Sequence, residues 1–384
     1  MPCRGSRTAP VMSEVVLHIG AFKTGTTFIQ ESLFMNQSRL RDLGVLVPGN
    51  RWADQAAAAR ALIARGDSDV GRETDAWDHL ADECRRWTGS SAVISMEFLA
   101  GLGASKVEAV VTSLQPGPIT VVLGARDLLG LLPAQWQTSI RGGGRVWTFG
   151  EYAAGVTATR PRRSAAGRHF WRRHDWPAIA RRWGAFAGPD RVRVVPLPGR
   201  GSDPSLLWWR FGAASGLPTA DLPPATRKNE SMGAASGELV RRLNVRATAD
   251  SSGLSVEGDR LRRRWVRDTL CSGVLIEHKA LETPLRAPAD LRPWATSRAE
   301  TLMTRLDADG VQVVGDVADL LPPAGDGPER HPRPPTEHDI LRAGEFALDR
   351  LAPDVLSPAR PGDEVEWLAE VVEVLYRLSV ASAA

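Results

Sequence analysis

The feature that most constrains this chain is an apolar run that ends in glycine and leads through a short loop into a helical pattern. Residues 15–20 (VVLHIG) predict a buried strand, and residues 28–43 carry apolar side chains at helical spacing. Between them, Gly20 and Gly25 have the G-x4-G spacing of a nucleotide phosphate loop. Gly25 permits a backbone turn that other residues resist. Successive backbone N–H groups and the amino terminus of the following helix would then face an anion.

The lysine of this loop has an unusual place. A phosphate loop normally continues with Lys-Ser/Thr after the second glycine, whereas here Thr26 and Thr27 follow and the lysine is Lys23. Only four of the 48 basic residues are lysines, so we expect Lys23 to be needed for its compact ammonium. A kinase or ATPase would also carry a metal-binding aspartate at the end of another strand. Asp127 is the only candidate, so a nucleotide-like donor that requires no metal fits better.

Three further apolar runs predict strands, at residues 92–98, 119–126 and 191–197. Because helical patterns alternate with them, the expected fold is α/β, with a P-loop-like parallel sheet of four or five strands flanked by helices. From about residue 205 the pattern is mainly helical. The expected parts are a disordered start (1–12), one domain (13–322, with an α/β core at 13–210 and a helical part at 211–322), a Pro/Gly linker (323–336) and a helical tail (337–384).

Composition excludes several classes of protein. A formal net charge of +3 over 384 residues does not suggest a nucleic-acid binder. The chain has no run of 18 apolar residues, so we expect no stable membrane insertion. Three widely spaced cysteines give neither a disulfide framework nor a metal pattern, and the start lacks the apolar stretch of a secretory signal. A reducing cytoplasm fits best.

One segment is strongly basic. Between Arg160 and Arg200 there are eleven arginines and only two acids, Asp175 and Asp190. Such a patch suits an anionic ligand or an acidic substrate. The alternative is an ordinary solvated basic surface.

The segment HIGAFKTGTTFIQESLFMNQSRLRDLGVLVPG resembles the opening of sulfotransferases that use 3′-phosphoadenosine 5′-phosphosulfate (PAPS), particularly a bacterial branch typical of actinobacteria. The likeness runs from about residue 13 to 322. It implies that Lys23 contacts the bridging oxygen and the leaving phosphate, and that the 5′-phosphate is held by Thr24, Gly25, Thr26 and Thr27. Phe28 falls where the family often has an aromatic residue against the adenine, although it could equally be a core residue of the helix.

Residues 121–140 (VVLGARDLLGLLPAQWQTSI) resemble the family's 3′-phosphate segment. Arg126 matches the arginine that ends the strand, and a guanidinium can engage a phosphate through two hydrogen bonds. The family's serine eight residues later is replaced by Ala134. Other contacts would have to compensate, from Gln135, Gln137 or a distal loop.

Such a loop is suggested by RKNESMGAASGELVRRLN, which resembles a polar N-x-S segment of the family. Arg227 and Lys228 are therefore expected to help bind the cofactor. A helix N-cap formed by Asn229 or Ser231 is the alternative reading.

The resemblance implies sulfuryl transfer, for which the acceptor hydroxyl needs a base. In AVISMEFLAG the family often has a Ser-His-Glu trio, and here Glu97 is the titratable member. Its alternative role is that of a carboxylate at a helix amino terminus. Rival bases lie in the basic segment, and His18 is expected to be a core residue. The rivals are His169, His174 and Asp175.

The sequence thus predicts a PAPS-dependent sulfotransferase that releases PAP, acting on a small-molecule, glycan or glycolipid acceptor. A P-loop kinase of small molecules is the first alternative, distinguished by use of ATP and metal. A non-catalytic protein that binds PAP or another nucleotide is the second, because Ala134 replaces the family serine.

Overall fold

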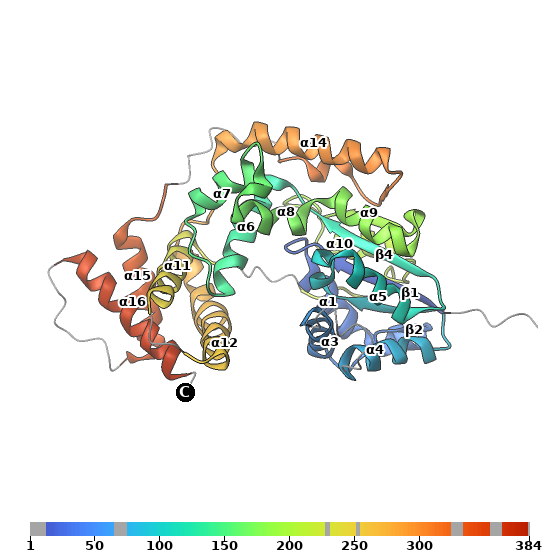
Figure 1. Cartoon of the computed structure of the whole chain (residues 1–384), viewed down its shortest axis with the longest axis horizontal. Coiled ribbons are helices and arrows are strands. Elements are labelled where there is room, and N and C mark those ends of the chain that lie inside the picture. Colours follow the sequence, from blue (N-terminus) through green and yellow to red (C-terminus); the bar gives the residue numbers. More distant parts are fainter. Residues whose placement is uncertain are drawn as a thin grey trace, which may run out of the picture. The chain divides into compact units, whose positions relative to one another are not determined.

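The computed structural model describes residues 13–64, 75–226, 231–250, 254–323, 333–353 and 363–382. By their contacts these form two compact units, which are described separately (Figure 1). The sheet unit comprises the described parts of Met1–Leu128, Arg172–Lys228 and Ala295–Pro323. The helical unit comprises those of Leu129–Trp171, Asn229–Trp294 and Ala324–Ala384.

The sheet unit is built on a parallel sheet of six strands within the described residues, in the order β2-β3-β1-β4-β5-β6. The four long strands are those that the sequence predicts, and the α/β fold class is confirmed. The two further strands have two residues each, too short for a hydrophobic pattern to reveal. The strands are β1 (Glu14–Gly20), β2 (Val45–Leu46), β3 (Ser91–Ser95), β4 (Ile119–Ala125), β5 (Val192–Pro196) and β6 (Gln312–Val313).

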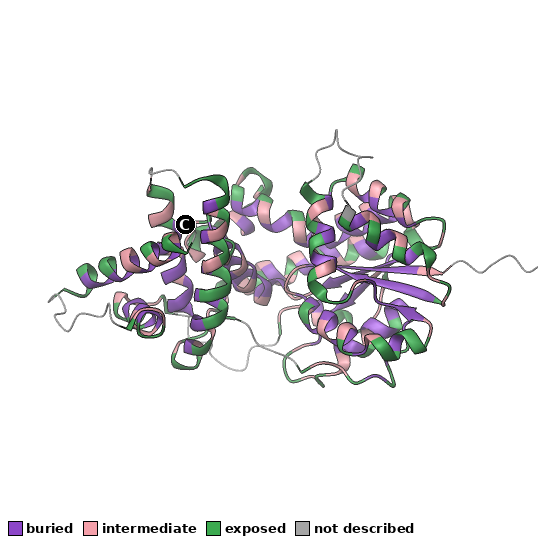
Figure 2. Ribbon diagram, turned by 90° about the horizontal axis from the view of Figure 1, so that it is seen from below, coloured by how far each residue is buried: buried purple, intermediate pink, exposed green. Residues whose placement is uncertain are grey.

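Helices cover the sheet of this unit, as expected for parallel strands whose residues are buried on both faces. Every residue of β3 and β4 is buried, and Figure 2 shows the strands in purple. The helices of the sheet unit are α1 (Thr26–Met35), α2 (Gln37–Asp42), α3 (Trp52–Ala64), α4 (Asp75–Arg86), α5 (Ala104–Leu114), α9 (Trp176–Ala187) and α10 (Leu206–Ser215), together with a 3₁₀ turn, η2 (Glu97–Gly101).

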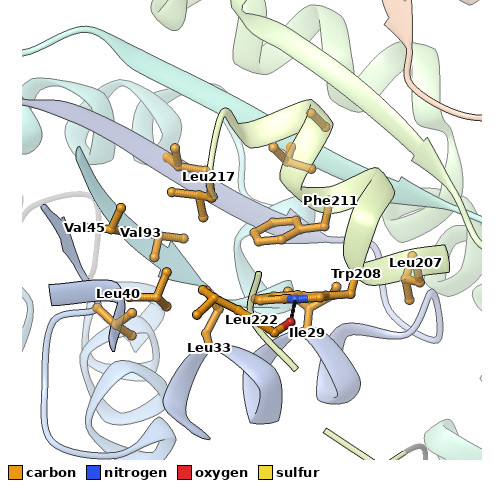
Figure 3. Packing of buried hydrophobic residues seen from close by; sticks show 14 of the residues in the cluster. Ile29, Leu33, Leu40, Val45, Val93, Leu207, Trp208, Phe211, Leu217 and Leu222 are labelled. Carbon is orange, nitrogen blue, oxygen red and sulfur yellow. Dashed lines mark hydrogen bonds between the residues drawn. The ribbon is translucent and has the colours of Figure 1, made fainter. Parts of the chain in front are cut away.

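One apolar cluster fixes α1 and α10 against the sheet (Figure 3). Trp208 and Phe211 of α10 stack with ring centroids 5.8 Å apart, and the Trp208 indole donates a 3.0 Å hydrogen bond to the carbonyl of Leu222. Ile29 and Leu33 of α1 belong to the same cluster. Burying aromatic and aliphatic side chains of this size stabilises the fold by about 1.5–3 kcal/mol each. The first turns of α1 are therefore held firmly in place.

The predicted helix over residues 28–43 is in fact two helices. Asn36 separates α1 from α2, and its amide donates hydrogen bonds to the carbonyls of Ser32 and Pro223, both at 2.8 Å. The side chain thus bonds to the backbone where the helix is interrupted, a local competition that periodicity alone does not reveal.

Three of the divisions between the units fall within helices: α6 (Leu128–Arg141), α8 (Ala165–His174) and α14 (Arg292–Ala308). In the helical unit, α15 (Glu337–Leu351) and α16 (Glu364–Ala381) of the tail pack on each other and on α11 (Ala234–Ala249). Arg242 of α11 binds Glu337 of α15 at 2.6 Å, and Arg246 binds Glu373 of α16 at 2.6 Å. The other helices of this unit are α7 (Phe149–Thr157), α11 (Ala234–Ala249), α12 (Val256–Trp265), a π-helical segment (Val266–Leu275), α13 (Ile276–His278), α15 (Glu337–Leu351) and α16 (Glu364–Ala381).

Among the helices of the described residues, none is long and apolar enough to cross a membrane.

Candidate anion-binding and catalytic site

The loop between β1 and α1 has the backbone of an anion cradle. Lys23 and Gly25 have positive φ angles, of 62° and 86°. Gly25 is the N-cap of α1 and offers no side-chain cap, and the first turn of the helix contains no acid. A helix that starts without a cap presents backbone N–H groups and the positive end of its dipole. The arrangement can therefore hold a phosphate or a sulfate.

Gly25 cannot be replaced without disturbing this cradle. A Cβ at this position would collide with Leu207 of α10, a residue of the apolar cluster beneath the loop. It would also have to adopt a φ angle that side chains disfavour. The φ angle is the stronger constraint, because the atoms that the Cβ would meet are methyl groups at the ends of the Leu207 and Leu197 side chains.

Three threonines of the loop have different environments. The hydroxyl of Thr24 is buried and donates a 2.6 Å hydrogen bond to the carbonyl of Ala21. The only proton of this hydroxyl is thus engaged within the loop, so Thr24 can donate a hydrogen bond to a ligand only from its backbone N–H. Thr26 is buried in the first turn of α1, and Thr27 is exposed beside it.

The loop is attached to the neighbouring strand β4. The backbone N–H of Ala21 donates to the carbonyl of Gly124 at 3.0 Å. Arg126, which follows β4, donates from Nη1 to the carbonyl of Lys23 at 3.3 Å. Its Nε also lies 3.6 Å from the carboxylate of Asp127. The structure thus brings the arginine that the sequence singled out to the lysine of the loop.

Glu97 lies against the other side of the loop. A Cβ built on Gly20 would come within 2.7 Å of the Glu97 Cβ and 2.9 Å of its Cα, so the backbone of Glu97 closely approaches the end of β1. The carboxylate is half-buried, and its Oε2 accepts a 2.8 Å hydrogen bond from the amide of Gln30. Gln30 also donates to the Ser95 carbonyl at 3.0 Å. The carboxylate is therefore oriented by the helix that the loop begins.

A buried polar network lies behind Glu97. Nδ1 of His18 is 2.7 Å from the hydroxyl of Ser95, and the Ser95 N–H donates to Gln55 at 2.9 Å. Burial lowers the pKa of His18 from 6.5 to about 4, so the ring is neutral at pH 7. The prediction that His18 is a hydrogen-bonded core residue is confirmed.

The rival bases have other surroundings. Asp175 is the N-cap of α9 and accepts from the Ala178 N–H at 3.3 Å, and His174 is fully buried. His169 belongs to the helical unit, where its Nε2 lies 2.8 Å from the hydroxyl of Ser139. That hydroxyl donates to the Gln135 carbonyl at 2.8 Å, so it accepts from the histidine rather than giving it a proton.

The remaining cofactor candidates are less informative. Phe28 is 6% exposed and belongs to the apolar cluster, which favours its core reading over contact with an adenine. In the helical unit, the amide of Gln137 donates to the Met232 carbonyl at 2.8 Å and so has a structural partner. Arg227 and Lys228 lie outside the described residues.

Sequence reasoning missed Gln30, whose only local signal is a polar residue on the apolar side of α1. It also missed Phe22 and Phe98, the neighbours of Lys23 and Glu97, whose ring centroids are 5.8 Å apart. Neither relationship follows from local spacing, because each joins segments more than sixty residues apart.

A separate cavity of about 450 Å³ opens beside β2, lined by Arg41, Leu46, His79, Asp82, Glu83, Arg86 and Trp87. It lies near the start of β3, where Ser90 bonds the Gly44 carbonyl. The loop and Glu97, by contrast, follow the carboxyl ends of β1 and β3. Ligands of open α/β sheets bind at carboxyl ends, so the loop is the candidate site.

The fold and this site define an α/β protein with a phosphate-loop-like turn and a carboxylate beside it. No family model matches the sequence, and no curated protein matches it. Among solved structures, a sulfotransferase from Alicyclobacillus acidocaldarius is similar over 58% of this chain and 87% of that one, with 15% identity and a TM-score of 0.38. That similarity is too weak to assign a function.

Proposed function

We propose that this chain is a sulfotransferase that moves a sulfuryl group from PAPS to a hydroxyl group of its acceptor. One observation carries the proposal: the loop that contains Lys23 is bonded by Arg126 on one side and closely approached by Glu97 at Gly20, at the carboxyl ends of three adjacent strands. A cation, a base and an anion cradle are the groups that this reaction requires.

The loop residues fit the donor. The 5′-phosphate is bound by the backbone N–H groups of Thr24 to Thr27, and Lys23 neutralises the charge that develops on the bridging oxygen. The missing side chain at Gly25 and the uncapped start of α1 support this role, since both leave the cradle open to an anion. Arg126 binds the 3′-phosphate, assisted by Arg227 and Lys228.

Glu97 is the base. The acceptor oxygen forms the new bond to sulfur while the bond from sulfur to the bridging oxygen breaks, and PAP leaves with that oxygen. The acceptor's proton passes to the carboxylate of Glu97. What supports this role is the close approach of Glu97 to Gly20, where a Cβ built on the glycine would come within 2.7 Å of the Glu97 Cβ, and the hydrogen bond from Gln30, which aims one carboxylate oxygen and leaves the other to accept a proton.

The acceptor is a small molecule, a glycan or a glycolipid bearing the reacting hydroxyl, and the reaction takes place in the cytoplasm without a metal ion.

A calorimetric titration of the full chain with PAP, and in parallel with ATP and Mg²⁺, tests the proposal. We expect PAP to bind at micromolar concentration or tighter and ATP to bind at least tenfold more weakly. A preference for ATP with Mg²⁺ would identify a kinase instead. Tight PAP binding without transfer of ³⁵S from labelled PAPS to any acceptor in a broad panel would identify a nucleotide-binding protein without catalysis.

A further inference from the structure

The strand that leads to Glu97 extends beyond the neighbouring edge strand. Within the described residues, β2 pairs with β3 only at the first two residues of β3. Ser95 is the last residue of β3 and is completely buried. The N–H of the following residue, Met96, donates to the His18 carbonyl of β1 at 2.8 Å. The N–H and C=O of Ser95 therefore point the other way, to the side where β2 has ended. Buried backbone groups require partners, and at Ser95 these must come from elsewhere.

Two glutamine side chains take the place of the missing strand. The Ser95 N–H donates to Oε1 of Gln55 at 2.9 Å, and the Ser95 carbonyl accepts from Nε2 of Gln30 at 3.0 Å. A side-chain amide offers the same kinds of donor and acceptor as a backbone peptide group. Both glutamines are buried. Together they pair the end of β3 as a neighbouring strand would.

Gln55 is itself fixed in place. It belongs to α3, and its Nε2 donates a 3.0 Å hydrogen bond to the carbonyl of Pro48, in the segment that follows β2. The third polar group of Ser95, its hydroxyl, lies 2.7 Å from Nδ1 of His18. Each polar group of Ser95 thus contacts a side chain of a different element, namely α3, α1 or β1. The backbone that enters Glu97, two residues later, is held from three directions.

We propose that Gln55 is a positioning residue for Glu97, and that it acts by holding the Ser95 N–H. This inference rests on the proposed function, in which Glu97 is the base. Gln30 bonds to the carboxylate itself, whereas Gln55 acts through the backbone. The place of that backbone is narrowly defined, because a Cβ built on Gly20 would come within 2.9 Å of the Glu97 Cα. A misplacement of about 1 Å can cost a catalytic group up to ~10²-fold in rate.

The test is Gln55→Met in the full chain, which nearly keeps the volume of the side chain and removes both of its hydrogen bonds. We expect kcat to fall about tenfold, measured as transfer of ³⁵S from labelled PAPS to the best acceptor of the panel that tests the proposed function. The Kd for PAP should stay unchanged. In the Glu97→Gln background the same substitution should cause no further loss, because the base that Gln55 positions is already absent. A purely structural role would lower kcat in both backgrounds.

Gln37→Met is the matched control. The amide of Gln37 donates to the carbonyls of Val47 and Gly49, on either side of Pro48, so this substitution loosens the segment to which Gln55 is anchored. It leaves the hydrogen bonds of Ser95 in place. We expect kcat and the Kd for PAP of this variant to match those of the wild type.

Equal losses of kcat in Gln55→Met and Gln37→Met would overturn the inference and leave the proposed function standing. So would an unchanged kcat in Gln55→Met, the same loss in the Glu97→Gln background, or weaker PAP binding in Gln55→Met. If Gln55→Met does not fold, hydrogen exchange of the wild type decides. The Ser95 amide should exchange slowly, and exchange at the rate of an unpaired amide would overturn the inference. A wild type that neither binds PAP nor transfers from PAPS would defeat the proposed function, and the inference with it.

Discussion

The amide of Gln30 joins two backbone segments that are 67 residues apart, by donating a 2.8 Å hydrogen bond to the carboxylate of Glu97. A second hydrogen bond, of 3.0 Å, reaches the Ser95 carbonyl. Since Gln30 is itself buried in α1, it holds Glu97 in one orientation relative to the loop that begins this helix.

Gln30→Met should therefore lower kcat about tenfold, because it keeps the volume of the side chain and removes both hydrogen bonds, each worth about 1 kcal/mol and more when the partner is charged. The Kd for PAP should stay unchanged. Gln37→Met is a matched control, since the Gln37 amide donates to the carbonyls of Val47 and Gly49 and touches no candidate site residue. Equal losses of kcat in the two variants would show that Gln30 acts through stability alone.

Glu97→Gln should lower kcat by at least ~10²-fold, because the amide is nearly isosteric but cannot take up the acceptor's proton. PAP affinity, measured by calorimetry, should hardly change. A variant with the wild-type rate would move the base to His169, His174 or Asp175.

Lys23→Ala should abolish turnover and weaken PAP binding while leaving the fold intact. The loop lies outside the apolar cluster, so the far-ultraviolet circular dichroism and the thermal midpoint should match those of the wild type. Transfer of labelled sulfate at the wild-type rate would contradict the assignment of this loop.

Arg126→Ala should reduce the preference for PAP over 5′-AMP by roughly 1–3 kcal/mol, since only PAP carries the 3′-phosphate that a guanidinium can bind. Both affinities are measured in the same buffer, because salt screens such contacts. An unchanged ratio of affinities would assign the 3′-phosphate to Arg227 and Lys228.

Buried, neutral His18 should make stability depend on pH. Its pKa is about 4 in the folded protein, below its ordinary 6.5, so the unfolded chain binds the proton more readily between these values. The free energy of unfolding should therefore fall as pH drops from about 6.5 to 4, by about 3 kcal/mol from this group. Urea unfolding of His18→Gln, which cannot charge, should show a correspondingly weaker pH dependence. If the free energy of unfolding falls equally with decreasing pH in the wild type and in the variant, His18 does not make this contribution.

The amino-acid sequence by itself determined the strand, loop and helix around Lys23, the four long strands and the α/β class. These follow from local periodicity and from glycine positions, which act within a few residues. It also picked out Glu97 and Arg126, through the resemblance of their segments to those of sulfotransferases. Both lie just after strands of the parallel sheet, whose carboxyl ends meet at one edge.

Only the tertiary structure decided which side chains meet at that edge. The hydrogen bond from Gln30 to Glu97 and the stacking of Arg173 on Phe22 join residues distant in the chain. The order of the six strands also depends on pairing between segments distant in the chain, and β2 and β6 are too short to show a hydrophobic pattern in the sequence. Packing also determines that the Thr24 hydroxyl points into the protein. The hydroxyl lies so close to Gly124 of β4 that a Cβ built on this glycine would overlap it. Such contacts depend on how separate elements pack, a property that spacing along the chain does not encode.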